Sequence, residues 1–258
     1  MSNSVFAQTD NYILKWKLKK NDSLIYKTEM IERPIIAYDD DSFTLIPPII
    51  FVDTSHEKKN ELTEINDSII TKLSKKREGV IDIEMVKKSN SKNLIAGQKI
   101  GFNRNIILRG SIYDNGTIES FYLSSRQKNL LALLFQLPNK SLRIGDTWTL
   151  DVNLVSMDQT IICDSAKRVN QATLVNVETN GADTIAYLRY NVSEYFSGHF
   201  ENSLFREQNT TMNIIFSAVG KFSISKGHWT YYDGDIVIHS SGILTSDMRT
   251  DFHLELPK

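Results

Sequence analysis

The sequence predicts a mainly β protein, built as a strongly curved antiparallel sheet or open half-barrel of roughly ten strands with two helices on its concave side. Three observations support this fold class. Apolar and polar residues alternate over long stretches, which is the period of a strand with one solvent-facing side. Turn sequences such as Asn115-Gly116 and Asn180-Gly181 separate these stretches at hairpin spacing. Two other segments, around Leu62 and Leu130, carry helical spacing instead.

The chain is long enough for one large or two small domains, and the absence of a linker or low-complexity tract indicates one. The chain has 258 residues, of which 41% are hydrophobic, enough for a substantial core. We expect a single β-rich domain over residues 11–258, with an irregular or helical insertion at residues 34–76. The formal net charge of -1 gives no basic excess that would favour nucleic acid. The sequence contains no apolar run of about 18 residues, so we expect no transmembrane segment.

The N-terminal residues suggest export. Residues 5–7 read Val-Phe-Ala and precede Gln8, which resembles the end of a signal peptide at its cleavage site. We therefore interpret residues 1–10 as a signal-peptide remnant or a disordered tail, and expect a periplasmic or cell-envelope-associated protein. The single cysteine, Cys163, has no partner for an intrachain disulfide. Its two isoleucine neighbours predict a small buried hydrophobe.

The first elements are predicted from their spacing. Residues 12–19 alternate strictly, Asn21-Asp22 supplies a turn, and residues 24–30 return, so we expect a β-hairpin. The paired prolines at 47 and 48 cannot donate to a ladder and predict irregular structure there. Four apolar residues then follow at spacings typical of one helix face, which predicts a surface helix packed on the sheet: Leu62, Ile65, Ile69 and Leu73.

The central segment predicts a strand, a hairpin and the second helix. Residues 80–85 alternate as a strand, and residues 105–113 and 117–123 flank an Asn-Gly turn. Ser124 or Ser125 is a suitable helix N-cap, and Pro138 ends the helix because the residue before proline disfavours helical backbone. Between them lies a wide apolar arc, which predicts a helix covered on more than one side: Leu130, Leu131, Leu133, Leu134, Phe135 and Leu137.

The C-terminal half is predicted as successive strands. A strand runs from Trp148 to residue 154, and a hairpin joins residues 172–177 to 184–190. Residues 212–224 and 229–239 form another pair, with a bulge expected at Asp233-Gly234. Residues 244–256 alternate most regularly and predict a last strand with one solvent-facing side.

Three segments resemble a known group of proteins. Residues 142–148 read Leu-Arg-Ile-Gly-Asp-Thr-Trp and resemble the (V/L)-x-(V/I)-G-D-x-W signature of exported, functionally uncharacterised bacterial proteins. Residues 168–174 with the following Asn-Gly turn, and residues 220–229, resemble further segments of that group. At the level of shape, the predicted fold is also similar to periplasmic half-barrels of the lipoprotein-carrier type. These resemblances imply export and a half-barrel fold that encloses acyl chains, and no particular activity, since fold does not fix function.

No motif for catalysis, a cofactor or a metal is found in the sequence. The five histidines form no HxH or HExxH pattern, although His228, His239 and His253 lie on strands that are expected to be neighbours. Residues 39–41 are three aspartates without the ligand spacing of a calcium loop. We therefore expect no enzyme, no catalytic residue and no cofactor.

Two functions fit these observations. The first is a non-catalytic exported binding module for a lipid or other apolar ligand, held in a groove between sheet and helices. Its expected ligand-binding residues are Leu130, Leu131, Leu134, Phe135, Trp148 and Trp229. The second is an accessory subunit of a cell-envelope assembly, in which the apolar helix or residues 34–51 dock on a partner protein.

Overall fold

The computed structural model describes residues 11–19, 22–35, 65–87, 106–122, 125–155, 161–200, 209–242 and 245–256. Within these ranges the chain forms one antiparallel sheet of 11 strands and one helix. The prediction of a mainly β fold is confirmed. The prediction of two helices is wrong, since only one is present in the described part of the chain.

Nearly all of the described elements are strands, as the alternation of apolar and polar residues predicts. The helix is α1 (Ser125–Phe135). The strands are β1 (Ser23–Pro34), β2 (Ile65–Arg77), β3 (Val80–Lys87), β4 (Ile106–Tyr113), β5 (Ile118–Phe121), β6 (Thr147–Trp148), β7 (Ile161–Asn180), β8 (Asp183–Phe200), β9 (Asn209–Ser223), β10 (His228–Ser241) and β11 (Ser246–Glu255).

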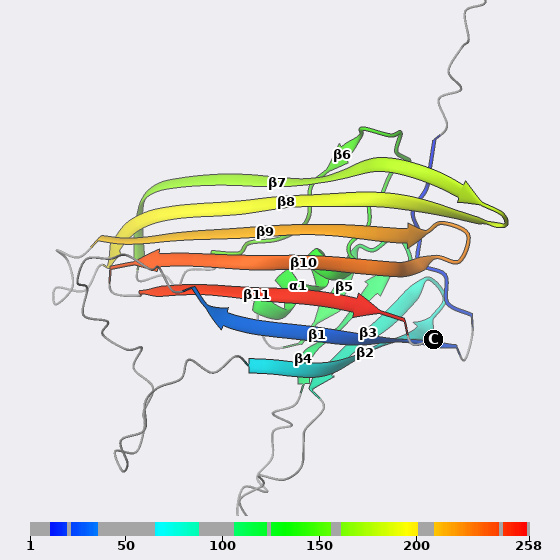
Figure 1. Ribbon diagram of the computed structural model, residues 1–258, viewed down its shortest axis with the longest axis horizontal. Coiled ribbons are helices and arrows are strands. Elements are labelled where there is room, and N and C mark those ends of the chain that lie inside the picture. Colours follow the sequence, from blue (N-terminus) through cyan, green and yellow to red (C-terminus); the bar gives the residue numbers. More distant parts are fainter. Residues whose placement is uncertain are drawn as a thin grey trace, which may run out of the picture.

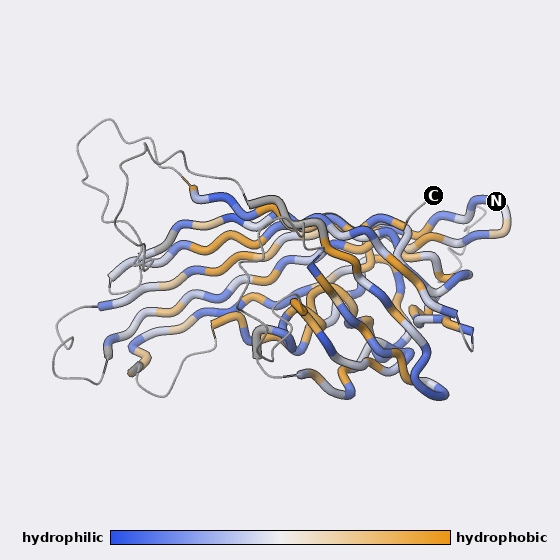
Figure 2. The backbone as a smooth tube through the Cα atoms, turned by 90° about the horizontal axis from the view of Figure 1, so that it is seen from below, coloured by the Kyte–Doolittle hydropathy of each residue, from blue (hydrophilic) through white to orange (hydrophobic). Residues whose placement is uncertain are grey.

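The sheet is open, with β5 at one edge and β6 at the other. Its order is β5-β4-β3-β2-β1-β11-β10-β9-β8-β7-β6, so the first and last strands of the chain pair in the middle. The long strands β7 to β11 lie side by side, while β3 and β5 slope behind them near α1 (Figure 1). Figure 2 shows the long strands extending well beyond the region where the other segments gather.

The predicted helix over residues 62–73 is wrong over its described part, which belongs to β2. Ile69 and Leu73 are both fully buried, but so is Thr71 between them, while Ile70 is exposed. A spacing of four residues fits both the helical period and two strand periods, so the two buried aliphatic residues did not distinguish the alternatives. The burial of Thr71 indicates a strand, because every second residue from 69 to 73 is then on one face. The Thr71 hydroxyl lies 2.7 Å from that of Thr28 on β1.

The predicted hairpin at residues 12–30 is also wrong. Residues 11–19, called here the N-terminal segment, make only an isolated bridge between Tyr12 and Leu142. Further on, Trp16 N donates to Asp114 O at 2.7 Å and Lys17 N to Gly227 O at 2.9 Å. The alternation is real, because every second side chain enters the core, but the segment crosses one end of the sheet. β1 instead lies between β2 and β11.

The turn glycines fix how tightly this end packs. Gly227 has φ of 72°, and a Cβ on it would collide with Lys17 of the N-terminal segment. Gly116 has φ of 79°, and a Cβ there would collide with the backbone nitrogen of Leu137 just after α1. Both turns therefore need glycine for its backbone conformation and for the close approach of another segment.

The predicted hairpin of residues 172–190 is present but much longer than expected. β7 and β8 pair along almost their whole length, from Asn180 and Asp183 to Ile161 and Phe200. Cys163 lies on the outer part of β7 and is exposed, so the prediction that it is buried is wrong. The expected bulge at Asp233-Gly234 is absent from the β9–β10 ladder, whose irregularity falls between Trp229 and Tyr231.

Candidate functional site

The six predicted ligand-binding residues all lie in the hydrophobic core. Four are on α1, one is on β6 and one is on β10, and none is more than 8% exposed: Leu130, Leu131, Leu134, Phe135, Trp148 and Trp229. They belong to a single core cluster between α1 and the sheet face it covers, called here the inner face. The structure thus brings the six predicted residues together in one cluster, where they pack with other buried side chains of the protein.

Three aromatic side chains hold α1 in this position. The last carbonyls of a helix have no partner within the helix. Here Tyr232 OH donates to Leu133 O at 2.6 Å, Trp229 Nε1 to Leu134 O at 2.8 Å, and Trp16 Nε1 to Phe135 O at 3.0 Å. Each of these three carbonyls at the end of α1 therefore has a buried donor from a segment remote in sequence.

The same aromatic residues pack against each other. Trp229 lies 5.1 Å from Phe222 and 5.1 Å from Tyr232 between ring centroids, both in edge-on arrangements. Trp16 lies 5.4 Å from Phe222. Sequence reasoning selected Trp229 but missed Trp16 and Tyr232. The signal for Trp16 was present in the alternation of residues 12–19, which marked it as inward-facing.

The inner face continues beyond the core cluster along the long strands. Five apolar residues on the far part of the long strands lie outside the core cluster: Phe196, Met212, Ile214, Ile238 and Met248. We call this set the open inner face. Phe196 pairs with Met212, Ile214 with Ile238, and Ile238 with Met248, so the five side chains share one side of four adjacent strands.

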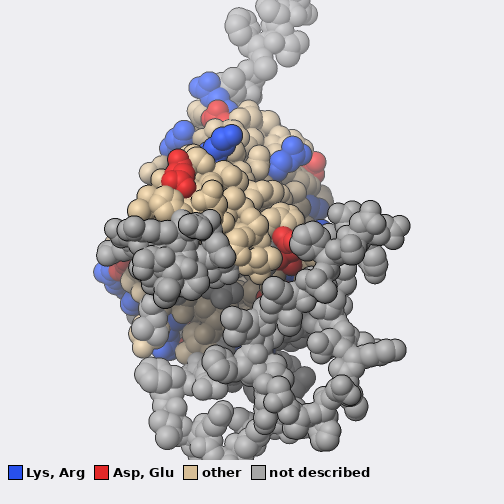
Figure 3. Space-filling model, turned by 90° about the vertical axis from the view of Figure 1, so that its left-hand side faces the viewer, with Lys and Arg blue, Asp and Glu red and all other residues tan. Residues whose placement is uncertain are grey.

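All five side chains of the open inner face are apolar. Seen from that end of the long strands, uncharged residues fill the middle of the described surface and charged residues lie towards its edge (Figure 3). Ile214 and Phe196 are buried, while Met212, Ile238 and Met248 are half-buried. Its three half-buried side chains leave part of this apolar surface accessible.

One buried carboxylate adjoins this surface. Glu194, the β8 neighbour of Ile214, is 2% exposed. Its Oε2 accepts a hydrogen bond from Val155 N at 2.8 Å, and its Oε1 lies 3.0 Å from Arg168 Nε without hydrogen-bond geometry. A buried charge of this kind needs a partner, and half-exposed Arg168 provides it from the neighbouring strand β7.

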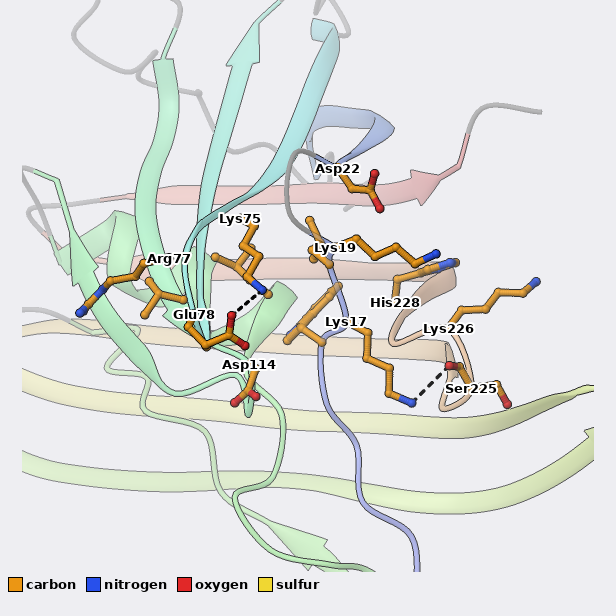
Figure 4. A pocket seen from close by; sticks show the side chains of 15 residues that line it. Lys17, Lys19, Asp22, Lys75, Arg77, Glu78, Asp114, Ser225, Lys226 and His228 are labelled. Atoms are coloured by element: carbon orange, nitrogen blue, oxygen red, sulfur yellow. Dashed lines mark hydrogen bonds and ion pairs between the residues drawn. The ribbon is translucent and has the colours of Figure 1, made fainter.

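A depression lies at the opposite end of the sheet. It has a volume of about 570 Å³ and is lined by the N-terminal segment, the β2–β3 turn and the β9–β10 turn. Its cations do not converge: Lys17 reaches Ser225 O, Lys75 reaches Glu78, and Arg77 points away (Figure 4). Lys226 is likewise paired, with Asp183 at 3.2 Å. The depression therefore offers no assembled anion site.

Two of the histidines that could approach one another across neighbouring strands, His239 and His253, are apart. His239 lies 2.9 Å from Asp247 and His253 lies 3.3 Å from Asp233, on the outer face of the sheet. The two pairs are separated by six positions of β10. Across the described residues no group of three or more histidine, cysteine or acidic side chains is arranged to hold a metal ion. Nor does the described part of the chain contain a helix long and apolar enough to span a membrane.

Comparison with protein-family models found no match, and comparisons with curated proteins and with solved structures found none either. The resemblance to the exported group therefore stays a prediction based on motifs. Residues 5–8, which carry the export prediction, and residues 36–51 of the predicted docking segment lie outside the described residues.

Proposed function

We propose that this protein is a non-catalytic, exported binding module that holds an apolar ligand, such as a lipid acyl chain, on the open inner face. The observation that carries the proposal is the excess length of the sheet over the helix. At about 1.5 Å per residue, the 11 residues of α1 span roughly 16 Å. At about 3.3 Å per residue, the 20 residues of β7 span roughly 66 Å. Among the described residues, the core cluster that contains α1 ends short of the open inner face, which supports another occupant there.

The energetics favour a hydrocarbon chain. Burying a methylene group contributes about 0.8 kcal/mol, so about ten methylenes contribute roughly 8 kcal/mol before binding costs. A net free energy of that size corresponds to a micromolar dissociation constant, and association costs of about 4 kcal/mol or more make the constant expected for ten methylenes weaker than that. Such binding needs no catalytic residue. Phe216 and Val192 belong to the core cluster and lie next to the open inner face. The predicted residues on α1, which are in the same cluster, would therefore support this surface at its end nearest the core.

The first test is native mass spectrometry on protein purified from the envelope of its own host, followed by solvent extraction. We expect a bound species of lipid mass. In parallel, dodecanoate binding is measured by calorimetry for Ile238→Lys and for Val237→Lys. The two positions are neighbours on β10, but only Ile238 faces inward, and both side chains are half-buried.

The matched pair separates ligand contact from general damage to β10. We expect Ile238→Lys to weaken dodecanoate binding about tenfold or more and Val237→Lys to leave it unchanged, because only the inner lysine places a charge against the chain. Equal effects of both substitutions, or no dodecanoate binding by the unmodified protein, would refute the proposal.

The alternative function, an accessory subunit of an envelope assembly, loses one of its two expected surfaces. The apolar side chains of α1 are buried and so do not offer a docking face. A different feature favours contact with another polypeptide, and it lies at the edge of the sheet.

A further inference from the structure

Strand β7 leaves a long backbone edge unpaired. β6 covers it only at Ala172 and Thr173, while β8 pairs with its other side throughout. Within the described residues, nothing pairs with the free side of residues 161–169, and residues 162–169 are all exposed. A free edge presents alternate N–H and C=O groups to solvent and is a template for a further strand.

A bulge sets which side chains share a face along this edge. Cys163 pairs with Gly198 and Ser165 with Ser197, so Asp164 is the extra residue. The outer face of the edge therefore carries Ile162, Ser165, Lys167 and Val169. The inner face carries Cys163, Ala166 and Arg168, as their partners on β8 require.

We propose that this edge pairs in antiparallel fashion with the same edge of a second copy of the chain, about a two-fold axis at Ala166. In this register Ala166 lies opposite its own counterpart. Ile162 of each copy lies opposite Val169 of the other, so this pair occurs twice. The pairing covers two large apolar side chains that are 44% and 45% exposed in the single chain. Opposed pairs of this kind are the unit of sheet stabilisation.

The neighbouring registers are worse. Moving the axis to Ser165 places Lys167 opposite Ile162, and moving it to Lys167 places two lysines opposite each other. In the proposed register, Asp164 lies beside Lys167 of the second copy. Lys167 has no carboxylate partner among the described residues, and Asp164 contacts only half-buried His199, at 3.2 Å. The lysine and the bulge, which normally protect an edge, here select one register.

The interface is small. A ladder of about ten residues per chain buries less surface than the roughly 1,200 to 2,000 Å² of a standard interface. We therefore expect a dissociation constant on the order of micromolar or weaker. The association is therefore reversible and concentration-dependent.

The register is tested by cysteine crosslinking in a Cys163→Ser background. Ala166→Cys should form an intermolecular disulfide under mild oxidation, because the two sulfur atoms face each other across the axis. Lys167→Cys is the control, since its opposite residue is Ser165. Equal crosslinking of the two variants, or none of Ala166→Cys, would overturn the proposed pairing.

Association is tested by sedimentation equilibrium of the unmodified chain and two double variants, with circular dichroism as the folding check. Ile162→Lys with Val169→Lys should lower the association constant about tenfold or more, because each lysine meets another. Ile162→Lys with Val169→Glu should restore it to within about threefold, since opposite charges then face each other. A chain that is monomeric at millimolar concentration, or an association constant unchanged by the two lysines, contradicts the proposal.

Discussion

The hydroxyl of Tyr232 provides the sharpest test of how α1 is held. It donates to Leu133 O at 2.6 Å, both groups are buried, and the ring has no access to solvent. Tyr232→Phe removes only this oxygen and leaves the aromatic packing in place. Nearby Tyr190, whose ring lies 5.7 Å away, is equally buried, but its hydroxyl has no hydrogen-bond partner. Tyr190→Phe is therefore a matched control.

The two substitutions should have opposite consequences. Without the Tyr232 hydroxyl, Leu133 O becomes a buried acceptor with no donor, which costs about 1 to 3 kcal/mol of unfolding free energy. Tyr190→Phe removes a polar atom that already lacks a partner, so its desolvation cost disappears, and we expect no loss or a gain of up to about 1 kcal/mol.

The assay is equilibrium urea unfolding followed by tryptophan fluorescence, with thermal unfolding as a second measure. For a chain of this size each kcal/mol corresponds to about 2 to 4 °C in Tm. The urea slope m should be the same for both variants and the unmodified protein, since the surface exposed on unfolding is unchanged. Equal stability losses for Tyr232→Phe and Tyr190→Phe would refute the reasoning, because the loss would then reflect packing alone.

Two further predictions concern buried hydroxyls. Burial raises the pKa of Tyr26, Tyr190 and Tyr232 above the ordinary value near 10. Above about pH 10 the unfolded chain loses three protons that the folded chain keeps, so unfolding free energy should fall by about 4 kcal/mol per pH unit, measured by urea titration at several alkaline pH values. The Thr28 and Thr71 hydroxyls bond only to each other in the core. Either Thr→Val substitution alone should cost about 1 to 3 kcal/mol, whereas the double variant should be nearly neutral, and additive losses in the double-mutant cycle would contradict this.

Much of the sheet was predictable because strand signals are local. The alternation of apolar residues and the Asn-Gly turns placed most of the strands, and Ser125 with Pro138 bracketed the helix. The failures share one cause. Residues 12–19 and 69–73 carry the correct inward-facing side chains, but the hydrogen-bond partner of each segment is set by distant parts of the chain.

The candidate site was less predictable for a related reason. The apolar arc of α1 was recognised, but whether protein or ligand fills the space beside it depends on Trp16, Trp229 and Tyr232, which approach it only in the folded chain. The open inner face was not recognised because β8 was predicted too short. Glu194 and Gly198 occupy inward positions of its far half and interrupt the apolar alternation.

The two proposed surfaces have a joint consequence that can be measured. A two-fold axis perpendicular to the sheet keeps both inner faces on the same side, and Ala166 at that axis is the β7 neighbour of Phe196 in the open inner face. A chain long enough to cross the axis would contact both copies. By linkage, two factors are then equal. One is the ratio of the ligand's affinity for the dimer to its affinity for the monomer, and the other is the increase that the ligand causes in the dimer association constant. Dodecanoate should therefore increase the association constant of the unmodified protein and bind more weakly to the variant with lysines at 162 and 169. Equal dodecanoate affinity in both proteins would mean that each copy holds its ligand alone.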